Sequence, residues 1–214
     1  MKKLDLSQLR EHYTLGGLLE SQANADPMVQ FGLWMDEAIK SEIPEPNAMA
    51  LGTVAESGYP EVRVVLLKEA NELGFVFYTN YKSDKARQMA AHPQVSLTFL
   101  WKMLQRQVRI LGTVSKLNEE QSAAYFDTRP TGSKIGAWVS PQSEVIAGRE
   151  YLEQRLQQVE QQYQDVAIPK PPHWGGYMVV PSSIEFWQGR PSRLHDRLRY
   201  TQRDGEWVME MLAP

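Results

Sequence analysis

The 214-residue sequence is 42% hydrophobic and 23% charged, the composition of a globular protein with one sizeable core or two small ones. Its formal net charge of −3 argues against a nucleic-acid binder, which usually carries a basic excess. The absence of cysteine excludes disulfides, thiolate nucleophiles and cysteine zinc sites. Because no secretory signal or membrane-spanning apolar run is found, we expect a cytoplasmic protein without a membrane partner.

The first part of the chain carries one helix signal and then a series of strand signals. Residues 4–13 are compatible with a short helix. Asp26 followed by Pro27 is typical of an N-cap and a first helical position, which predicts a helix over residues 28–41. Apolar, β-branched and aromatic runs separated by turn residues predict strands at residues 48–55, 61–68 and 74–79. We expect these strands to pair antiparallel, because short turns join them as hairpins.

Helices and strands are also predicted in the rest of the chain. Ser83 is expected to cap a helix that ends at Ala91, and Asn118 with Gln121 resembles a capping box that opens a helix to about residue 128. Further helical segments are expected at residues 133–140 and 144–164, and further strands at residues 94–101, 106–117, 177–180, 183–188, 193–202 and 207–212. The sequence therefore predicts a single α+β domain, residues 1–214, whose antiparallel sheet closes into a barrel.

Several common site motifs are absent from the sequence. It contains no G-x-G-x-x-G or G-x-x-x-x-G-K phosphate loop, no G-x-S-x-G and no H-E-x-x-H. Its histidines lack the spacing of metal ligands, so we expect no metal centre. A bound phosphate would therefore be held by arginine, lysine and hydroxyl side chains.

Three basic side chains alternate near the C-terminus. Arg193, His195 and Arg197 would share one face of an extended strand, because alternate residues of a strand point the same way. Such a row favours an anionic ligand with a group that exchanges a proton. The alternative is a solvated edge strand whose charges protect against aggregation.

Two further groups contain the residue types that bind phosphate. Arg63 and Lys68 stand at the ends of one apolar strand, on opposite faces if the strand is regular, and such terminal charges often only reach solvent. Tyr125 and Arg129 share a helix face, and Ser133 follows closely. This second group suits a phosphate monoester, but a surface Tyr–Arg stack would have the same sequence.

Other polar and aromatic positions are weaker candidates. Thr79 and Ser83 offer hydroxyls at a strand end and a helix start, and Lys85 lies on that helix. Gln107 lies in an apolar strand, and its amide matches the edge of a uracil-like ring. Trp187 is placed to flank a planar ring, although an isolated strand tryptophan is usually part of a core or an interface.

A series of motifs runs through nearly the whole chain: R-E-H-Y-T-L-G-G-L, R-V-V-L-L-K, F-Y-T-N, R-Q-V-R-I-L-G, R-P-T-G-S-K-I-G-A-W-V-S-P-Q-S, F-W-Q-G and R-L-H-D-R. In these motifs and their order the sequence resembles the pyridoxamine 5′-phosphate oxidase family. The resemblance implies an α+β fold with an antiparallel split β-barrel, flanking helices and FMN at a homodimer interface. It also implies oxidation of pyridoxine or pyridoxamine 5′-phosphate to pyridoxal 5′-phosphate, with O2 as acceptor and H2O2 as by-product.

The resemblance further implies which residues contact each ligand. The FMN contacts would be Arg63, Val64, Val65, Leu66, Leu67, Lys68, Tyr78, Thr79, Lys85, Gln107, Gln142, Ser143, Trp187 and Arg197. The substrate contacts would be Arg10, Tyr13, Lys68, Tyr125, Arg129, Ser133, Arg193, Leu194 and His195. Arg193 and His195 are the implied catalytic residues over the pyridine ring. Residues 1–25 would form a mobile segment that covers the bound substrate.

The sequence departs from the family beside Lys85, where Asp84 stands in place of the basic residue of many relatives. An acid there would weaken a flavin phosphate site unless its side chain points away. Two other functions stay open. A flavin reductase of the same fold would share the flavin contacts but would not need the substrate-phosphate and pyridine-ring residues. A non-catalytic protein that binds flavin or pyridoxal phosphate is the second alternative.

Overall fold

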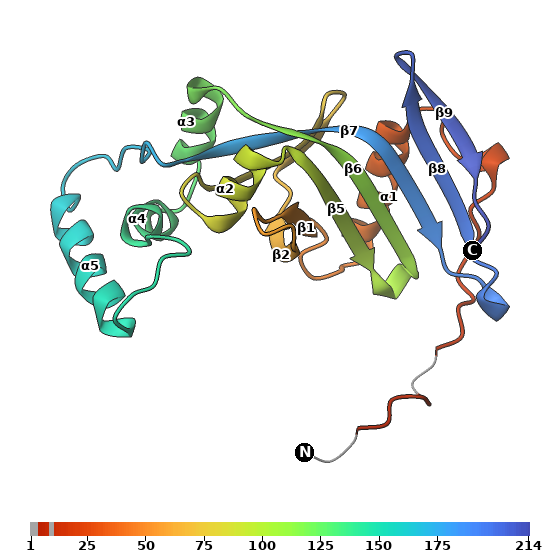
Figure 1. The fold of residues 1–214 in the computed structure, drawn as a ribbon, viewed down its shortest axis with the longest axis horizontal. Helices are drawn as coiled ribbons and strands as arrows, with labels where there is room; N and C mark the ends of the chain where they lie inside the picture. The colour runs from red at the N-terminus through yellow and green to blue at the C-terminus, as the bar shows by residue number, and fades with distance from the viewer. Residues whose placement is uncertain (1–3, 9–10) are drawn as a thin grey trace. The chain divides into compact units, whose positions relative to one another are not determined.

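The computed structural model describes residues 4–8 and 11–214 (Figure 1). The strands are β1 (Ala48–Val54), β2 (Pro60–Leu66), β3 (Glu69–Asn71), β4 (Gly74–Asn80), β5 (Gln94–Trp101), β6 (Arg106–Lys116), β7 (Trp174–Gln188), β8 (Asp196–Arg203) and β9 (Glu206–Met211). The helices are α1 (Pro27–Lys40), α2 (Asp84–Ala91), α3 (Glu119–Asp127), α4 (Thr131–Val139) and α5 (Arg149–Gln162). In this described part, no helix is long and apolar enough to cross a membrane.

Two helices begin at the caps that the sequence predicts. The Asp26 side chain accepts a hydrogen bond of 2.7 Å from the N–H of Met28, at the start of α1. Asn118 and Gln121 form a reciprocal capping box at the start of α3. Ser83 occupies the cap position of α2, but its hydroxyl donates to the Asn80 carbonyl at 2.7 Å and does not cap the helix.

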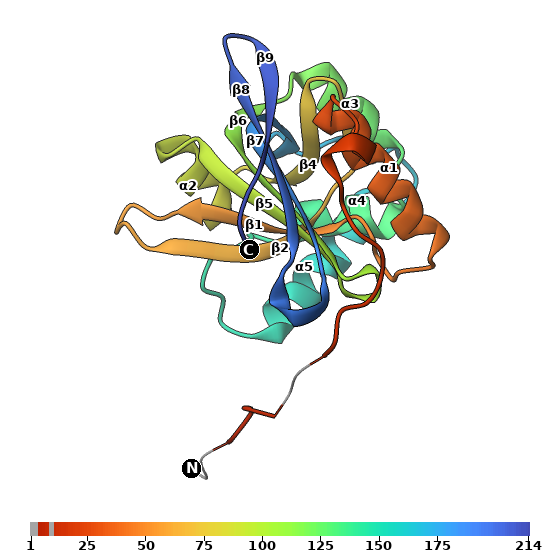
Figure 2. The ribbon, with the colours of Figure 1, turned by 90° about the vertical axis from the view of Figure 1, so that its right-hand side faces the viewer.

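The sheet joins its strands in the order β2-β1-β5-β6-β7-β4-β3, and β8 pairs with both β7 and β9. The pairs β1–β2, β3–β4, β4–β7, β7–β8 and β8–β9 are antiparallel, and β8 and β9 run side by side in Figures 1 and 2. In the first hairpin, Leu51 lies opposite Arg63 and Thr53 opposite Glu61. The predicted α+β class, with an antiparallel sheet and flanking helices, is confirmed.

Strand β7 is longer than the sequence predicts. The two strands expected at residues 177–180 and 183–188 are one continuous element, which begins at Trp174, three residues before the first expected strand. Its first part pairs with β4 and its last part with β8. Pro181 lies between these stretches, where neither of the two ladders needs the N–H that proline lacks.

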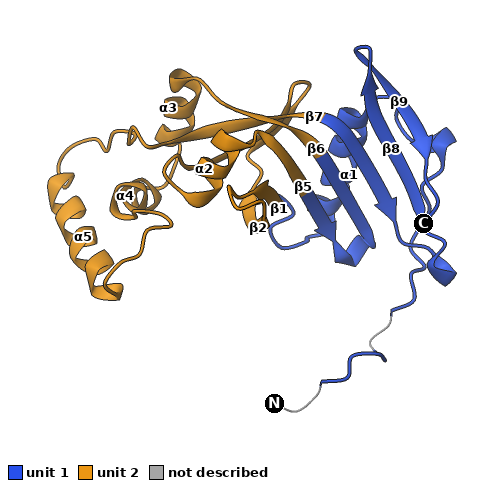
Figure 3. Cartoon of the chain, in the orientation of Figure 1, with its two compact units in different colours: residues 1–47, 98–110, 182–214 blue, residues 48–97, 111–181 orange. Residues whose placement is uncertain are grey.

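The chain divides into two compact units (Figure 3). Unit 1 comprises residues 1–47, 98–110 and 182–214, and its core contains the buried side chains of Phe31, Trp34, Phe99, Phe186 and Tyr200. Unit 2 comprises residues 48–97 and 111–181, and its core contains the buried side chains of Met49, Leu51, Phe75, Phe77 and Val179. Aromatic rings pack closely in both cores, as in the Trp34–Phe186 pair at 5.2 Å and the Phe77–Tyr177 pair at 5.6 Å between ring centroids.

Two further predictions of secondary structure were wrong. The short helix expected at residues 4–13 is absent from the described residues 4–8 and 11–13, as expected where a short helix lacks packing support. The strand expected from residue 193 begins only at Asp196, because Pro191–Arg193 forms a 3-10 turn in which Ser192 and Arg193 have positive φ angles of 58° and 62°. Arg193, His195 and Arg197 therefore do not alternate along one strand.

Candidate active site

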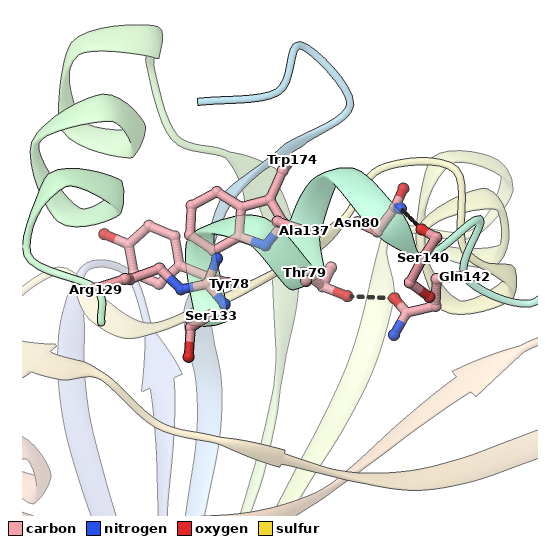
Figure 4. A pocket seen from close by; sticks show the side chains of 10 residues that line it. Tyr78, Thr79, Asn80, Arg129, Ser133, Ala137, Ser140, Gln142 and Trp174 are labelled. Carbon is pink, nitrogen blue, oxygen red and sulfur yellow. Dashed lines mark hydrogen bonds between the residues drawn. The ribbon is translucent and has the colours of Figure 1, made fainter. Parts of the chain in front are cut away.

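A cavity of about 650 Å³ in unit 2 contains many of the predicted ligand contacts. This volume is in the range of small-molecule sites. Its wall is formed by Arg63, Val64, Val65, Leu66, Lys68, Tyr78, Thr79, Lys85, Tyr125, Thr128, Arg129, Pro130, Ser133, Gln142 and Trp174. Figure 4 shows a neighbouring cavity that shares Tyr78, Thr79, Arg129, Ser133, Gln142 and Trp174 with it. Strands β2, β4 and β7 and helices α2, α3 and α4 supply these side chains directly or through adjoining loops.

One wall of the cavity is a stack of aromatic rings. The Tyr78 ring lies 3.9 Å from the Tyr125 ring and 5.3 Å from the Trp174 ring between centroids, with interplanar angles of 16° and 12°. The guanidinium of Arg129 lies over the Trp174 ring at 4.6 Å (Figure 4). Burial raises the pKa of Tyr78 to about 12, so its phenol is neutral at physiological pH. The stack therefore presents apolar faces beside a cation.

The cavity also holds cations that are partly removed from water. The Nη1 atom of Arg129 is buried and has no hydrogen-bond partner among the described residues. Lys85 is only 9% exposed, and its Nζ donates to Thr79 Oγ1 and Gln142 Oε1, both at 3.3 Å. Burial lowers the pKa of both Arg129 and Lys85, and the nearby Arg63 lowers that of Lys85 further. An unpaired buried donor is costly, so Arg129 Nη1 fits an anionic ligand that supplies the missing acceptor, and the Lys85 charge favours such a ligand as well.

Asp84 does not line this cavity. Its carboxylate forms an ion pair with Arg87, one turn further along α2, and Arg87 also donates to the Lys82 carbonyl. The backbone N–H of Asp84 donates to Ser143 Oγ at 3.2 Å. Asp84, the residue that departs from the family pattern, therefore pairs its carboxylate with the neighbouring Arg87.

A second cavity, of about 580 Å³, lies in unit 1. Its wall is formed by Glu11, His12, Tyr13, Trp187, Arg190, Ser192, Arg193 and His195. The His195 ring lies 4.6 Å from the Trp187 ring and 5.6 Å from the Tyr13 ring between centroids. Although Arg193 and His195 do not share a strand, the turn before β8 brings both to this cavity.

The protonation state of His195 follows from its hydrogen bond. Its Nδ1 lies 3.0 Å from the backbone nitrogen of Arg190, whose N–H donates to it, so the neutral ring carries its proton on Nε2. Burial lowers the pKa of His195, Arg193 lowers it further, and Asp196 opposes both. His195 is therefore expected to be neutral near pH 7, with an Nε2–H donor.

An NMR titration of the His195 ring protons is expected to give a midpoint below that of an exposed histidine. With its lowered pKa, His195 binds a proton less readily in the folded chain than in the unfolded chain. The contribution of His195 to folding stability is therefore fully present above the ordinary histidine pKa. That stability is lost as the pH falls through the lowered value. A His195 midpoint above the ordinary histidine pKa of 6.5 would contradict the assignment.

The N-terminal segment of residues 11–19, here called the strap, is held by side chains of unit 1. The N–H groups of Thr14 and Leu15 donate to Gln105 Oε1 at 2.9 and 3.1 Å. The Leu18 N–H donates to Asp196 Oδ2 at 2.9 Å. At Gly189, an added Cβ would lie only 2.9 Å from the Tyr13 ring, so a larger residue there would displace the strap.

Replacing Gln105 by glycine is expected to loosen the strap. Gln105 has left-handed backbone angles (φ 54°, ψ 40°), which glycine adopts without strain, so the change removes only the side chain. Loss of two neutral hydrogen bonds should increase amide hydrogen exchange at Thr14 and Leu15 roughly tenfold. Amides of α1 provide the control. Unchanged exchange at both strap amides would show that Gln105 does not hold the strap.

Comparison with known proteins assigns the chain to a family. A family model described as "Pyridoxamine 5'-phosphate oxidase" matches residues 35–163, more than half of the chain. The chain belongs to the pyridoxamine 5′-phosphate oxidase family. A second model, described as "Pyridoxine 5'-phosphate oxidase C-terminal dimerisation region", matches residues 174–214 of this oxidase family member.

Curated relatives support the assignment over the full length. This oxidase family member is 52% identical to a pyridoxine/pyridoxamine 5′-phosphate oxidase of Synechocystis sp. over 214 residues, with 100% of both chains covered. It is also 52% identical to one of Pseudomonas paraeruginosa over 211 residues, with 98% of both chains covered.

Solved structures of similar proteins show the same fold. PhzG from Burkholderia lata, in complex with tetrahydrophenazine-1-carboxylic acid, is 27% identical with a TM-score of 0.88, over 94% of this chain and 99% of that one. A pyridoxamine 5′-phosphate oxidase-related, FMN-binding protein from Nostoc punctiforme is 17% identical with a TM-score of 0.69, over 89% and 100% of the two chains. The predicted split-barrel fold of the pyridoxamine 5′-phosphate oxidase family is confirmed.

The structure groups most, but not all, of the residues implied for this family. Leu67 is buried and does not line the unit 2 cavity. Ser143 does not line it either, and its Oγ accepts a hydrogen bond from the Asp84 N–H. Arg197 is paired with Glu185 at 2.9 Å. The implied residues that line neither large cavity are Leu67, Gln107, Ser143, Leu194 and Arg197. Arg10 lies outside the described residues.

The sequence reasoning missed several residues of the cavity wall. Trp174 lies outside the strands predicted from the sequence, yet it begins β7 and stacks in the aromatic wall. Thr128 and Pro130 flank Arg129 and also line the cavity. For Thr128 and Pro130, the only available signal was their closeness to Arg129 in sequence. Trp174 had no local signal, because only tertiary packing brings it to Tyr78.

Proposed function

We propose that this protein is an FMN-dependent oxidase that converts pyridoxine or pyridoxamine 5′-phosphate to pyridoxal 5′-phosphate, with O2 as acceptor and H2O2 as by-product. The observation that carries the proposal is the buried, unpartnered Nη1 of Arg129 in a cavity walled by stacked aromatic rings. A planar ring bearing a phosphate satisfies both features. Family membership and the full-length relatives support the same reaction.

The unit 2 cavity has the donors that a flavin phosphate and a substrate phosphate require. Bound FMN would supply the redox chemistry, and the protein supplies position and charge. The residues of this cavity that would hold FMN are Arg63, Val64, Val65, Leu66, Lys68, Tyr78, Thr79, Lys85 and Gln142. The residues that would clamp the substrate phosphate are Lys68, Tyr125, Arg129 and Ser133. Clamping the phosphate fixes the carbon to be oxidised in one orientation.

The unit 1 cavity supplies the groups assigned to the pyridine ring. Arg193 is a fixed positive charge that orients the ring and stabilises negative charge developing on it. His195 donates a hydrogen bond from Nε2 to the phenolic oxygen carried by the pyridine ring, since its Nδ1 already accepts from the Arg190 N–H. This tautomer favours a hydrogen-bond donor over a proton acceptor for His195. Tyr13 of the strap also lines this cavity and contacts the His195 ring.

A homodimer is part of the proposal. The C-terminal dimerisation region of the family covers residues 174–214, which include Trp187, Arg193 and Arg197. We infer that FMN binds at the dimer interface, where one protomer provides the flavin cavity and its partner provides these residues. A single domain over residues 1–214, a cytoplasmic location and the absence of nucleic-acid and membrane partners stay predictions from the sequence.

The decisive experiment follows the visible absorption of the FMN-loaded protein. Pyridoxine 5′-phosphate is added in the absence of oxygen, and air is then admitted. Bleaching that reverses in air, with pyridoxal 5′-phosphate formed, is the expected result. An unchanged spectrum with flavin still bound would contradict the oxidase. Oxidation of NADH or NADPH would then indicate a flavin reductase, and its absence a binding protein.

A further inference from the structure

The guanidinium of Arg63 is enclosed by a set of oxygen acceptors within unit 2, here called the collar. Its Nη1 donates to Thr53 Oγ1 and to the Leu51 carbonyl, the latter at 3.3 Å. Its Nη2 donates to Gln88 Oε1 at 3.1 Å and to the Glu61 carboxylate at 3.2 Å. Arg63 therefore has a defined orientation at the wall of the cavity even without a ligand.

The collar is built by the pairing of β1 with β2 and by α2. Leu51 lies opposite Arg63 and Thr53 opposite Glu61, so these residues occupy neighbouring rungs of the hairpin. Helix α2 contacts β1 and supplies Gln88. Because Gln88 follows Lys85 by three residues, both side chains lie on the same face of α2. One helix face thus supplies a cavity cation and part of the collar.

Two side chains of the collar, Thr53 and Gln88, are buried and hydrogen-bonded to each other. They are 2% and 7% exposed, and the Thr53 hydroxyl donates to Gln88 Oε1 at 2.5 Å. The same Thr53 oxygen accepts from Arg63, and the same Gln88 oxygen accepts from Arg63. These three hydrogen bonds constrain one another. Together they set the rotation of the Thr53 hydroxyl, the orientation of the Gln88 amide and the plane of the Arg63 guanidinium.

The chemistry of the collar preserves the charge of Arg63. The buried acceptors are a hydroxyl, an amide and a backbone carbonyl, which are neutral. The carboxylate of Glu61 is 47% exposed, so solvent screens its interaction with Arg63. A cation held by neutral groups can attract an anion, whereas a cation held by a buried carboxylate would be neutralised.

We propose that Thr53 and Gln88 are positioning residues that hold Arg63 in place and so make the cavity select a phosphorylated flavin over the unphosphorylated one. The inference rests on the proposed FMN-binding function. Thr53 and Gln88 act through Arg63, because neither lines the cavity and Arg63 does. Their effect should therefore depend on the ligand phosphate and on the presence of Arg63.

The test compares the affinities of FMN and riboflavin, measured by fluorescence quenching, for the full-length apoprotein. Thr53→Val keeps the shape of the side chain and removes the hydroxyl, whereas Thr53→Ser keeps the hydroxyl and is the matched control. We expect Thr53→Val to weaken FMN binding about tenfold, since a hydrogen bond to a charged group is lost. Riboflavin affinity, and FMN affinity in Thr53→Ser, should stay within about twofold of wild type.

A double-mutant cycle with Arg63→Met separates positioning from a general structural effect. In that background, Thr53→Val should cause no further loss of FMN affinity. An equal loss for FMN and riboflavin, or the same loss in both backgrounds, would overturn the inference. If the wild type prefers FMN to riboflavin and Thr53→Val binds FMN as tightly as the wild type does, the inference is overturned but the assigned cofactor is not. A wild type that does not distinguish the two flavins would overturn the assigned cofactor as well.

Gln88→Leu provides a second variant if Thr53→Val fails to fold, which urea unfolding would reveal. Leucine removes the amide acceptor on the α2 side of the collar and leaves Thr53 intact. The same FMN-specific loss, dependent on Arg63, is expected for this variant. Loss of riboflavin affinity to the same degree would again overturn the inference.

Discussion

Replacement of Arg193 by alanine is expected to lower kcat by about two to four orders of magnitude while FMN stays bound. Arg193 lines the unit 1 cavity together with His195, and among the residues that the structure describes Arg190 is the other arginine that lines it. Arg190 is held by the strap carbonyl of Gly16 and by the Asp196 carboxylate, so it is not free to replace Arg193. Removing a charge that stabilises a transition state lowers kcat and kcat/KM together.

The backbone of Arg193 suggests two companion variants. Its φ of 62° is left-handed, so Arg193→Gly removes the side chain without backbone strain and should match the alanine variant. Arg193→Lys keeps the charge but not the planar fork and should recover part of the activity. Arg203→Ala, in the β8–β9 hairpin, is the control that should leave kcat unchanged. Near-normal turnover in Arg193→Ala would remove Arg193 from the mechanism.

Arg129→Ala is the second change with a large expected effect, and it should act mainly on KM. Arg129 Nη1 is buried without a partner, and burial lowers the pKa of this guanidinium, so a bound phosphate gains a strong interaction there. Loss of a charge-assisted contact of this kind should raise the KM for the phosphorylated substrate roughly a hundredfold. The kcat should change little, because the phosphate is bound equally in the ground and transition states.

Steady-state kinetics with pyridoxine 5′-phosphate measure both parameters for Arg129→Ala. Arg149→Ala serves as the matched control, since Arg149 is an exposed arginine on α5 that pairs with Glu153. We expect normal kinetics for that control. A loss confined to kcat in Arg129→Ala would contradict the phosphate clamp. Thermal unfolding of the ligand-free variant should show little loss of stability, because the change also removes an unsatisfied buried donor.

Much of the secondary structure could be predicted because its signals are local. The Asp26 and Asn118 caps each bond an N–H within three residues, so the starts of α1 and α3 are readable from a few letters. The first hairpin follows from its turn and its apolar strands. Helix α5 begins at Arg149, five residues after the predicted start, because the preceding residues carry no cap signal.

The candidate site was predictable only in part. The individual cations and hydroxyls could be named from the motifs, and most of them line a cavity. Their grouping could not be worked out from spacing. Arg63 and Lys68, placed on opposite faces by strand periodicity, both line the unit 2 cavity, because β2 ends at Leu66 and Lys68 lies beyond its end. Conversely, Arg193, His195 and Arg197 do not share a strand face, since Pro191 and two left-handed residues form a turn.

By itself, the sequence determined the α+β class, the places of most helices and strands, and, through its ordered motifs, the family. Only the tertiary structure decided that Trp174 completes the aromatic wall, that Thr53 and Gln88 enclose Arg63, and that Asp84 turns onto Arg87. Caps, turns and periodic patterns act within a few residues. Thr53 and Gln88 lie 10 and 25 residues from Arg63 in sequence, and Trp174 lies 96 residues from Tyr78, so the collar and the wall form only when the strands pair and the helices pack.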